Sequence, residues 1–270
     1  MNSKASNWAA IIAAGGFAPP DIRRASGENF KALARVGGTP AIQYVYRACL
    51  HASFERIIIA APEEVHRVIE PSSNTIFVQS GETNIRTARN GLEKCDEQAF
   101  CFLPCDTPLL SDAHLRDFRS KILERLEVPL DSSWFAIGLS PATEVCKSFP
   151  EFRYRFLRFR EGRFASGALL AASRKGFEST FELLEEASQN RKRFWKLFFE
   201  IGKKLGMIDI ARYLSGKIDI REAEKRVGEL LGGQAIIVPD CSPATTLDFD
   251  TAKEWMTINE HWEKLRRKNL

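Results

Sequence analysis

The sequence has few of the residues that build metal clusters and acid–base relays. Its four histidines show no HxxxH spacing and no pattern with serine and aspartate, so we assign them no role. Its six cysteines lack the CxxC pairs of a zinc site and the density of a secreted scaffold. We therefore expect reduced thiols with packing roles, in a cytoplasmic protein. The cysteines are Cys49, Cys95, Cys101, Cys105, Cys146 and Cys241.

Long hydrophobic runs are also lacking. Residues 1–16 imitate a signal peptide, with Lys4 before an apolar patch, but this patch is too short to span a membrane. We expect no targeting segment and no stable membrane insertion. Internal repeats, low-complexity tracts and obvious linkers are lacking too. We therefore interpret the chain as a single domain over residues 1–270.

Neither sign of charge dominates the sequence. Charged residues make up 27% of the chain and hydrophobic residues 44%, an ordinary globular composition that excludes a wholly disordered chain. The formal net charge of +4 suits a polyanionic small molecule as well as it suits nucleic acid. The sequence lacks a basic stripe with interleaved aromatic residues on a recognisable binding module, so we expect no nucleic-acid partner.

The stretch between Trp8 and Lys31 carries the most informative pattern in the chain. Residues 8–14 are a short apolar run that predicts a strand. Gly15 and Gly16 end the run, and glycine permits both unusual backbone conformations and a close approach to a ligand. Basic side chains follow that can donate hydrogen bonds to phosphate oxygens. These basic residues are Arg23, Arg24 and Lys31.

Apolar strand-like segments alternate with helical segments through the first half of the chain. Strands are predicted at 8–14, 54–62, 74–80 and 99–106. Helices are predicted after Thr39-Pro40, read as an N-cap and a first helical proline, and at Pro62, 84–94 and 111–126. Near-continuous apolar strands between helices indicate parallel pairing with helices on both faces of a sheet. We therefore expect an α/β fold of the doubly wound type.

Three predicted strand ends carry residues suited to ligand binding. They are Gly15-Gly16 after the first strand, Ser80-Gly81 after the third and Asp106 after the fourth. In parallel sheets, ligands bind beyond the carboxyl ends of the strands. We expect these three groups to meet at one edge of the sheet.

The pattern changes in the second half of the chain. After a predicted strand at 132–140, residues 152–164 alternate aromatic or apolar residues with arginine around Glu161-Gly162, which indicates two short strands and a turn. A further strand is predicted at 165–176. Residues 177–233 have helical patterns only.

Strand character returns after these helices, in the segments AIIVPD and TLDFD. We therefore interpret residues 177–233 as a helical insertion into one domain. A last helix is predicted from Thr251 to about residue 265.

Residues 191–204 form a basic amphipathic segment with two interpretations. One is contact with a membrane surface or a lipid substrate. The favoured one is a helix that packs over the sheet or forms a homodimer interface, with a solvated basic face. We also hypothesise that this segment folds over the carboxyl ends of the strands and shapes a ligand pocket there. Its apolar stripe is Phe194, Phe198, Ile201 and Leu205.

Three aspartates are candidate metal ligands. Asp106 lies where a strand ends, and a carboxylate there can reach a hard cation that bridges to nucleotide phosphates. Asp248 and Asp250 are spaced at period two, so on a strand they share one face, and either could supply a second ligand. The alternative is that Asp106 caps a turn and that Asp248 or Asp250 caps the helix at Thr251.

The segment SGETNIRTARNGL at 80–92 places a glycine before the start of a helix. Exposed N–H groups there suit an anion or the edge of a base. The alternative is an ordinary helix start with Thr83 or Asn84 as its cap.

Together these segments resemble the nucleotidyltransferases of the molybdenum cofactor guanylyltransferase-like superfamily. The family's LAAGxGxRM, PK and GKP motifs are matched in order by IIAAGG, FKAL and GGTP. SGETNIRTARNGL is similar to its SGxxxxxSxxxGL segment, with Thr87 at the serine position. PCDTP resembles its DxP motif, and LDFDTAKEW its DVDTPEDL signature. The resemblance covers about residues 8–142 and 235–262 and is weak in the helical region.

The resemblance implies a Rossmann-like three-layer α/β/α sandwich with a mostly parallel sheet, of the nucleotide-diphospho-sugar transferase type. It implies transfer of a nucleotidyl group from an NTP, with GTP or CTP favoured, to a phosphorylated small-molecule acceptor. Pyrophosphate is released, and Mg²⁺ or Mn²⁺ is the implied cofactor. Positioning and charge neutralisation are enough for this chemistry.

The resemblance also assigns roles to individual residues. Ala13, Ala14, Gly15 and Gly16 would line the nucleotide, and Ser80, Gly81 and Thr87 would lie near the base or ribose. Lys31, with Arg23 or Arg24, would contact phosphates. Asp106 would bind the metal, completed by Asp248 or Asp250.

The chain departs from the family pattern after Gly16. FAPPDI replaces the family's third glycine and arginine, the two arginines come later in a longer loop, and Phe30 replaces the proline before the lysine. The alternative interpretation is therefore a catalytically weak nucleotide-binding or regulatory relative.

Overall fold

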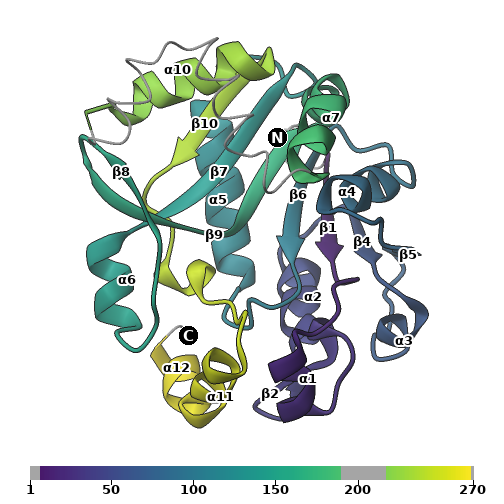
Figure 1. The fold of residues 1–270 in the computed structure, drawn as a ribbon. Coiled ribbons are helices and arrows are strands. Elements are labelled where there is room, and N and C mark those ends of the chain that lie inside the picture. The colour runs from purple at the N-terminus through teal and green to yellow at the C-terminus, as the bar shows by residue number, and fades with distance from the viewer. Residues whose placement is uncertain (1–6, 190–216, 269–270) are drawn as a thin grey trace.

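The computed structural model describes residues 7–189 and 217–268, and most strands of this part form one sheet (Figure 1). The sheet order is β10-β7-β9-β6-β1-β4-β5, and β8 pairs with β9. The strands are β1 (Trp8–Ala13), β4 (Arg56–Ala60), β5 (Thr75–Val78), β6 (Ala99–Pro104), β7 (Trp134–Pro141), β8 (Phe156–Phe159), β9 (Gly162–Ser173) and β10 (Gln234–Val238). A separate hairpin pairs β2 (Arg35–Val36) with β3 (Thr39–Pro40).

Helices cover both faces of the sheet. The helices are α1 (Pro20–Ser26), α2 (Ala41–His51), α3 (Glu63–His66), α4 (Asn84–Leu92), α5 (Asp112–Arg125), α6 (Ala142–Ser148), α7 (Arg174–Gln189), α10 (Ile220–Leu231), α11 (Ala252–Glu260) and α12 (Trp262–Lys268). Two short 3₁₀ turns lie at Lys31–Leu33 and Pro243–Thr246. The candidate amphipathic segment at 191–204 lies outside the described residues.

The alternation of side chains along β1 shows why its sequence is apolar throughout. Trp8, Ala10 and Ile12 are buried in the core under α2 and α5. Ala9 and Ile11 are buried in a second core on the opposite face, under α4 and α7. Because both faces of this strand are buried, a polar side chain at any of these positions would be placed in a core. The predicted three-layer α/β/α arrangement is therefore confirmed.

The sheet is mostly parallel, as predicted, with one exception. β1 pairs in parallel with β4 and β6, β4 with β5, and β7 with β10. β9 runs antiparallel between β6 and β7. The predicted boundary between a two-stranded piece and a further strand at 165 is wrong, because β9 continues unbroken from Gly162 to Ser173. The predicted turn before Gly162 is confirmed.

Three predicted boundaries near the ends of elements are also corrected. Thr39 does not cap α2; it pairs in the β2–β3 hairpin, where Gly37 and Gly38 both have positive φ, as a tight two-residue turn requires. TLDFD is not a strand, because the 3₁₀ turn Pro243–Thr246 follows β10 and carries the chain away from the sheet. The last helix is divided at His261 into α11 and α12.

The six cysteines are free thiols, five of them buried, which agrees with the predicted packing role. No helix among the described residues is both long and apolar enough to cross a membrane.

Candidate active site

Lys31 stands at the carboxyl end of β1 although a long loop separates it from Gly16. The backbone N–H of Lys31 donates to the carbonyl oxygen of Gly16 at 3.1 Å. Phe17 and Phe30 form a bridge, and their rings stack with centroids 5.1 Å apart. The loop that carries α1 is therefore closed at its base. The departure from the family pattern lengthens the loop without moving the lysine away from the glycines.

Lys31 lies between two aspartates that come from distant parts of the chain. Its Nζ forms an ion pair with Oδ2 of Asp106, just after β6, and another at 2.6 Å with Oδ1 of Asp250, just before α11. The Lys31 and Asp106 side chains are 14% and 9% exposed, whereas that of Asp250 is 77% exposed. Nζ also lies 5.5 Å from the ring centroid of the buried Phe249. An ammonium group is thus held at the carboxyl end of β1, beside the carboxylate that follows β6.

The two carboxylates determine the charge state of Lys31. Burial disfavours the charged ammonium, but the negative charge of Asp106 and the hydrogen bonds to both aspartates outweigh it and raise the pKa of Lys31 above its usual range. The lysine is therefore a permanent cation at neutral pH. It can bind phosphate oxygens but cannot act as a base.

Asp248 lies beside this group and shares its electrostatic field. Burial is the largest cause that raises the pKa of Asp248, and the negative charges of Asp106 and Asp250 raise it further, to about 7. The Asp248 side chain nevertheless still reaches solvent. Lys31 opposes the shift. Three carboxylates around one lysine leave an excess of negative charge, which favours a further cation.

The extended backbone over 247–250 explains why the two late aspartates lie on one side. Leu247 and Phe249 are fully buried, and Asp248 and Asp250 are exposed. The predicted common face is therefore correct, although the segment is not part of the sheet. Neither aspartate caps α11; Thr251 does, with Glu254 in a capping box.

The residues fit a divalent metal in one specific respect. Among the described residues, Oδ1 of Asp106 is one of the few buried side-chain oxygens with no hydrogen-bond partner. A buried carboxylate oxygen without a donor is a costly arrangement that a hard cation would relieve. Within residues 7–189 and 217–268, however, no three acidic, histidine or cysteine side chains are already arranged to hold a metal. Metal binding at Asp106 with Asp248 or Asp250 stays a prediction.

Gly15 and Gly16 form the glycine loop after β1, and this loop lies directly against the predicted Ser80-Gly81 segment. A Cβ atom at Gly15 would lie 2.0 Å from Oγ of Ser80, whereas one at Gly16 would meet nothing within 4 Å. Neither glycine has a φ in the left-handed region. Gly15 is therefore needed for the close approach of two loops, and the expectation of an unusual backbone conformation is wrong. Ala14 is buried, and its N–H donates to Ala60 O, which continues the ladder with β4.

This contact predicts the effect of one substitution and its repair. Gly15→Ala should push Ser80 and its loop away, and so weaken NTP binding about tenfold or more, the equivalent of about 1.4 kcal/mol. Gly15→Ala/Ser80→Gly is the matched variant, because it removes the two Ser80 side-chain atoms that the new Cβ would meet. Its affinity for NTP should recover in part. Titration calorimetry with NTP and Mg²⁺ would measure both variants, and wild-type affinity in Gly15→Ala would contradict the role given to Gly15.

Thr87 supports the second loop from behind. Its Oγ1 accepts a hydrogen bond from the backbone N–H of Gly81 at 3.0 Å and donates to the Gly81 carbonyl at 3.4 Å. Its side chain is buried. Thr87 therefore holds Gly81 in place. Thr83, one of the two predicted caps, is the N-cap of α4, and its Oγ1 accepts from the N–H of Arg86.

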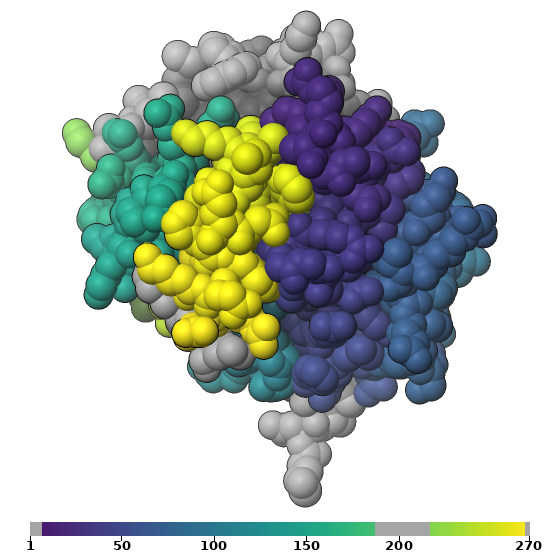
Figure 2. All heavy atoms as spheres, turned by 90° about the horizontal axis from the view of Figure 1, so that it is seen from below, coloured from purple at the N-terminus to yellow at the C-terminus, as the bar shows by residue number. Residues whose placement is uncertain are grey.

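Within the described part of the chain, neither Arg23 nor Arg24 forms an ion pair with the aspartates around Lys31. Both are exposed on α1, and the guanidinium of Arg23 lies 6.0 Å from the Phe17 ring centroid. Oδ2 of Asp21 accepts a hydrogen bond from the N–H of Ala252 at 2.8 Å, which joins α1 to α11. Figure 2 views this end of the molecule and shows the C-terminal helices beside the N-terminal loop. The arginines therefore lie on the exposed surface of α1, and their role in phosphate contact stays a prediction.

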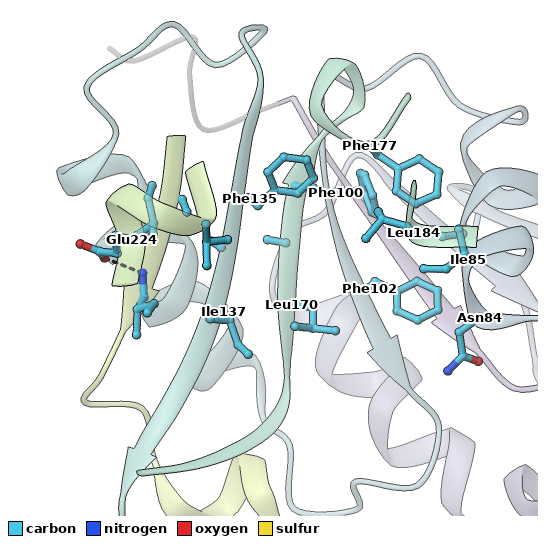
Figure 3. Close-up of a pocket in the computed structure, with 18 residues that line it drawn as sticks. Asn84, Ile85, Phe100, Phe102, Phe135, Ile137, Leu170, Phe177, Leu184 and Glu224 are labelled. Carbon is cyan, nitrogen blue, oxygen red and sulfur yellow. Dashed lines mark hydrogen bonds between the residues drawn. The ribbon is translucent and has the colours of Figure 1, made fainter. Parts of the chain in front are cut away.

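An apolar cavity of about 310 Å³ lies elsewhere, on the sheet face between α4, α7 and α10 (Figure 3). Its lining is dominated by apolar side chains such as Phe100, Phe102 and Phe135. The labelled polar side chains are Asn84 and Glu224, and Glu224 accepts a hydrogen bond from the Ile237 N–H at 2.7 Å. None of the candidate site residues lines this cavity, so the charged site at the strand ends is separate from it.

Two contributors to the site were missed from the sequence. The ring of Phe249 lies beside the ammonium group of Lys31. The alternation of apolar and acidic residues in Leu-Asp-Phe-Asp could have indicated that Phe249 is buried. Glu185, in α7, contacts the segment after Gly81, and no sequence pattern indicated it.

The matches to known proteins agree with this geometry. Residues 10–130 match the family model of the MobA-like NTP transferase domain, which confirms the resemblance over this part of the chain. No match is found among curated proteins.

Solved structures show the same fold over nearly the whole chain. A hypothetical transferase from Thermus thermophilus is 22% identical, with a TM-score of 0.75 over 93% of this chain and 99% of its own. A nucleotidyl transferase from Methanothermobacter thermautotroptrophicus is 16% identical, with a TM-score of 0.55 over 95% and 98%. The 4-diphosphocytidyl-2C-methyl-D-erythritol synthase of Anaerococcus prevotii is 12% identical, with a TM-score of 0.56 over 96% and 99%. These likenesses confirm the predicted fold class.

Proposed function

We propose that this chain, whose residues 10–130 match a MobA-like NTP transferase domain, transfers a nucleotidyl group from an NTP to a phosphorylated small-molecule acceptor. Pyrophosphate is the other product. The observation that carries the proposal is the position of Lys31, which lies beside the glycine loop of β1 and between the carboxylates that follow β6 and precede α11.

The reaction exchanges one phosphorus–oxygen bond for another. A phosphate oxygen of the acceptor attacks the α-phosphorus of the NTP, and the bond from that phosphorus to the bridging oxygen breaks, so that pyrophosphate leaves with the bonding electrons. Little covalent help from the protein is needed, because charge neutralisation and positioning lower the barrier. A bound divalent cation would supply charge neutralisation at the phosphates.

Each proposed role follows from what the residue can donate or accept. Lys31 binds phosphate oxygens with its ammonium group, and its two aspartates hold that group in place before the nucleotide arrives. Asp106, with Asp248 or Asp250, would hold Mg²⁺ or Mn²⁺, since these cations prefer oxygen ligands. Gly15 and Gly16 leave room for the nucleotide beside Ser80 and Gly81. Arg23 and Arg24 would attract the triphosphate from the rim.

A pyrimidine or guanine nucleotide is the proposed substrate, with CTP or GTP favoured. The family resemblance motivates this choice, and the solved structures of similar fold include a CMP:2-keto-3-deoxy-manno-octonic acid synthetase complexed with CTP, at 12% identity and a TM-score of 0.56. We expect the reaction to take place in the cytoplasm, since the six thiols are free. Association into a homodimer is a further expectation.

The second candidate is a nucleotide-binding relative with weak turnover. The lengthened loop motivates it, because Arg23 and Arg24 lie on the exposed surface of α1, later in the chain than the arginine of the family pattern. Such a protein would bind NTP with Mg²⁺ and release no pyrophosphate with any acceptor.

Nucleotide binding is the first test of the proposal. The melting temperature should rise when NTP and Mg²⁺ are added together, because a ligand that binds only the folded state stabilises it, by about 2.7 kcal/mol at one hundred times its Kd. The measurement is a thermal shift with each of the four NTPs, with and without EDTA. No shift with any NTP would contradict both candidates.

Pyrophosphate release then separates the two candidates. The four NTPs would be tested against a panel of sugar phosphates, polyol phosphates and phosphorylated cofactors. Release that depends on one acceptor supports the transferase. Binding without release from any combination supports the weak relative.

A further inference from the structure

Glu185 connects the helical region to the loop that follows β5. It lies on α7, and its side chain is 8% exposed. Oε2 accepts a hydrogen bond from Oγ1 of Thr83 at 2.9 Å, and Oε1 accepts one from Nε of Arg86 at 2.6 Å. Both partners are about one hundred residues away in sequence, so this contact depends on the tertiary structure.

These hydrogen bonds act on the segment that faces the glycine loop. Thr83 is the N-cap of α4, and the chain before it runs through Glu82 and Gly81 to Ser80, which touches Gly15. Thr87 holds Gly81 on one side of this segment, and Glu185 holds Thr83 on the other. The segment 80–83 is thus held at both ends by buried side chains.

A hollow of about 520 Å³ adjoins this segment. It is lined by Ser80, Gly81 and Glu82 from the loop, by Arg86 from α4 and by Glu185 from α7, among others. The four NTPs share their triphosphate and differ only in the base, so a loop held rigidly beside such a hollow is suited to distinguish bases.

We propose that Glu185 is a positioning residue for nucleobase recognition, acting through Thr83 and Arg86 on the segment 80–83. The inference rests on the proposed function. The match to the NTP transferase family ends at residue 130, so base choice would depend on a helix outside the matched domain. Two charge-assisted hydrogen bonds to one buried carboxylate are strong enough for this role.

The chain offers a matched control for the effect of helix packing. Arg174, at the start of α7, donates a hydrogen bond to the carbonyl oxygen of Leu92, at the end of α4, at 3.0 Å, and it does not line the hollow. Arg174→Ala therefore loosens the same pair of helices without removing a hydrogen bond to the segment 80–83. Glu185→Gln keeps the shape and part of the hydrogen bonding, whereas Glu185→Ala removes both acceptors.

The test is calorimetric titration of the full chain, in Mg²⁺, with the four NTPs and with inorganic triphosphate. Glu185→Ala should bind the preferred NTP about tenfold more weakly and lose discrimination among the bases. Its affinity for inorganic triphosphate should not change. Glu185→Gln should be intermediate, and Arg174→Ala should match the wild type.

Three outcomes would overturn the inference. Unchanged base discrimination in Glu185→Ala would show that Glu185 does not position the loop. An equal loss of affinity for inorganic triphosphate would show a general loosening of the site. Failure of the wild type to bind any NTP would remove the proposed function, and this inference with it, whereas the first two outcomes leave the proposed function intact.

Discussion

Lys31→Met is expected to lower kcat/KM for nucleotidyl transfer by about 10²–10³, as removal of one preorganised charged donor does in other active sites. Methionine keeps the length and the apolar stem of lysine and removes only the cation. The loss should fall mainly on kcat if Lys31 binds the leaving pyrophosphate more strongly in the transition state than in the bound NTP. It should fall mainly on KM if Lys31 binds the phosphates equally strongly in both states. Steady-state pyrophosphate release measures both constants.

The same substitution should reveal the electrostatic coupling in the site. Without Lys31, the buried carboxylate of Asp106 loses its cation, and breaking such a pair typically costs about 3–5 kcal/mol. Mg²⁺ should restore part of the lost stability, because it can replace the ammonium beside Asp106. In EDTA, Lys31→Met/Asp106→Asn should be more stable than Lys31→Met alone, because it contains no unpaired buried charge at position 106. The double variant therefore still tests the coupling if Lys31→Met alone does not fold.

Lys121 provides a matched control for this experiment. Its Nζ also lies between two aspartates, at 2.8 Å from Asp117 and 2.9 Å from Asp240, but on the outer face of α5. Lys121→Met should leave kcat/KM unchanged, since an exposed surface ion pair contributes about 1 kcal/mol or less to stability. Full activity in Lys31→Met would refute the proposed site.

Asp106→Asn is expected to reduce nucleotidyl transfer by about 10²–10³, and to abolish the metal-dependent part of the thermal shift. Asparagine preserves the size of the side chain and an oxygen for Lys31. It removes the negative charge that a divalent cation needs, at the one residue of the site whose Oδ1 is buried without a partner. The variant should fold, because Lys31 retains Asp250.

The contribution of Asp106 to metal binding can be measured without turnover. The melting temperature of wild type and variant would be measured with NTP in Mg²⁺, in Mn²⁺ and in EDTA. Asp240→Asn is the control, since Asp240 pairs with Lys121 away from the site. A metal-dependent shift of wild-type size in Asp106→Asn would mean that Asp248 and Asp250 suffice, and that Asp106 only holds the lysine.

Short-range signals explain most of the correct predictions. The strand at β1, the glycines after it and the aspartate after β6 all follow from local apolar runs and the residues that end them. The order of the motifs also indicated the resemblance to this family, which the match over residues 10–130 confirms for that part of the chain. The lysine could be placed near Gly16 only by that resemblance, because nothing local in residues 17–29 shows that the loop closes on itself.

The errors came where pairing with a distant strand decides the structure. The sequence predicted a boundary between two strands at 164–165, but β9 crosses it because this strand pairs with β8 and then with β7 and β6, with a register shift against β7. Conversely, 246–250 has the alternation of a strand but pairs with no strand among the described residues, since the preceding turn carries it away from the sheet. Strand character in a sequence says which side chains are buried, and the partner strand alone decides whether a sheet forms.

The sequence by itself determined the α/β class, the glycines that follow β1 and the individual charged residues that we propose as ligands of phosphate and metal. Those features depend on the periodicity and conformational preferences of neighbouring residues. Only the tertiary structure decided that Lys31 lies between Asp106 and Asp250, that Ser80 excludes a side chain at Gly15, and that Glu185 holds the loop. These contacts join residues far apart in the chain, so the backbone between them must be ordered before they can form. The whole packed core provides the free energy for that ordering.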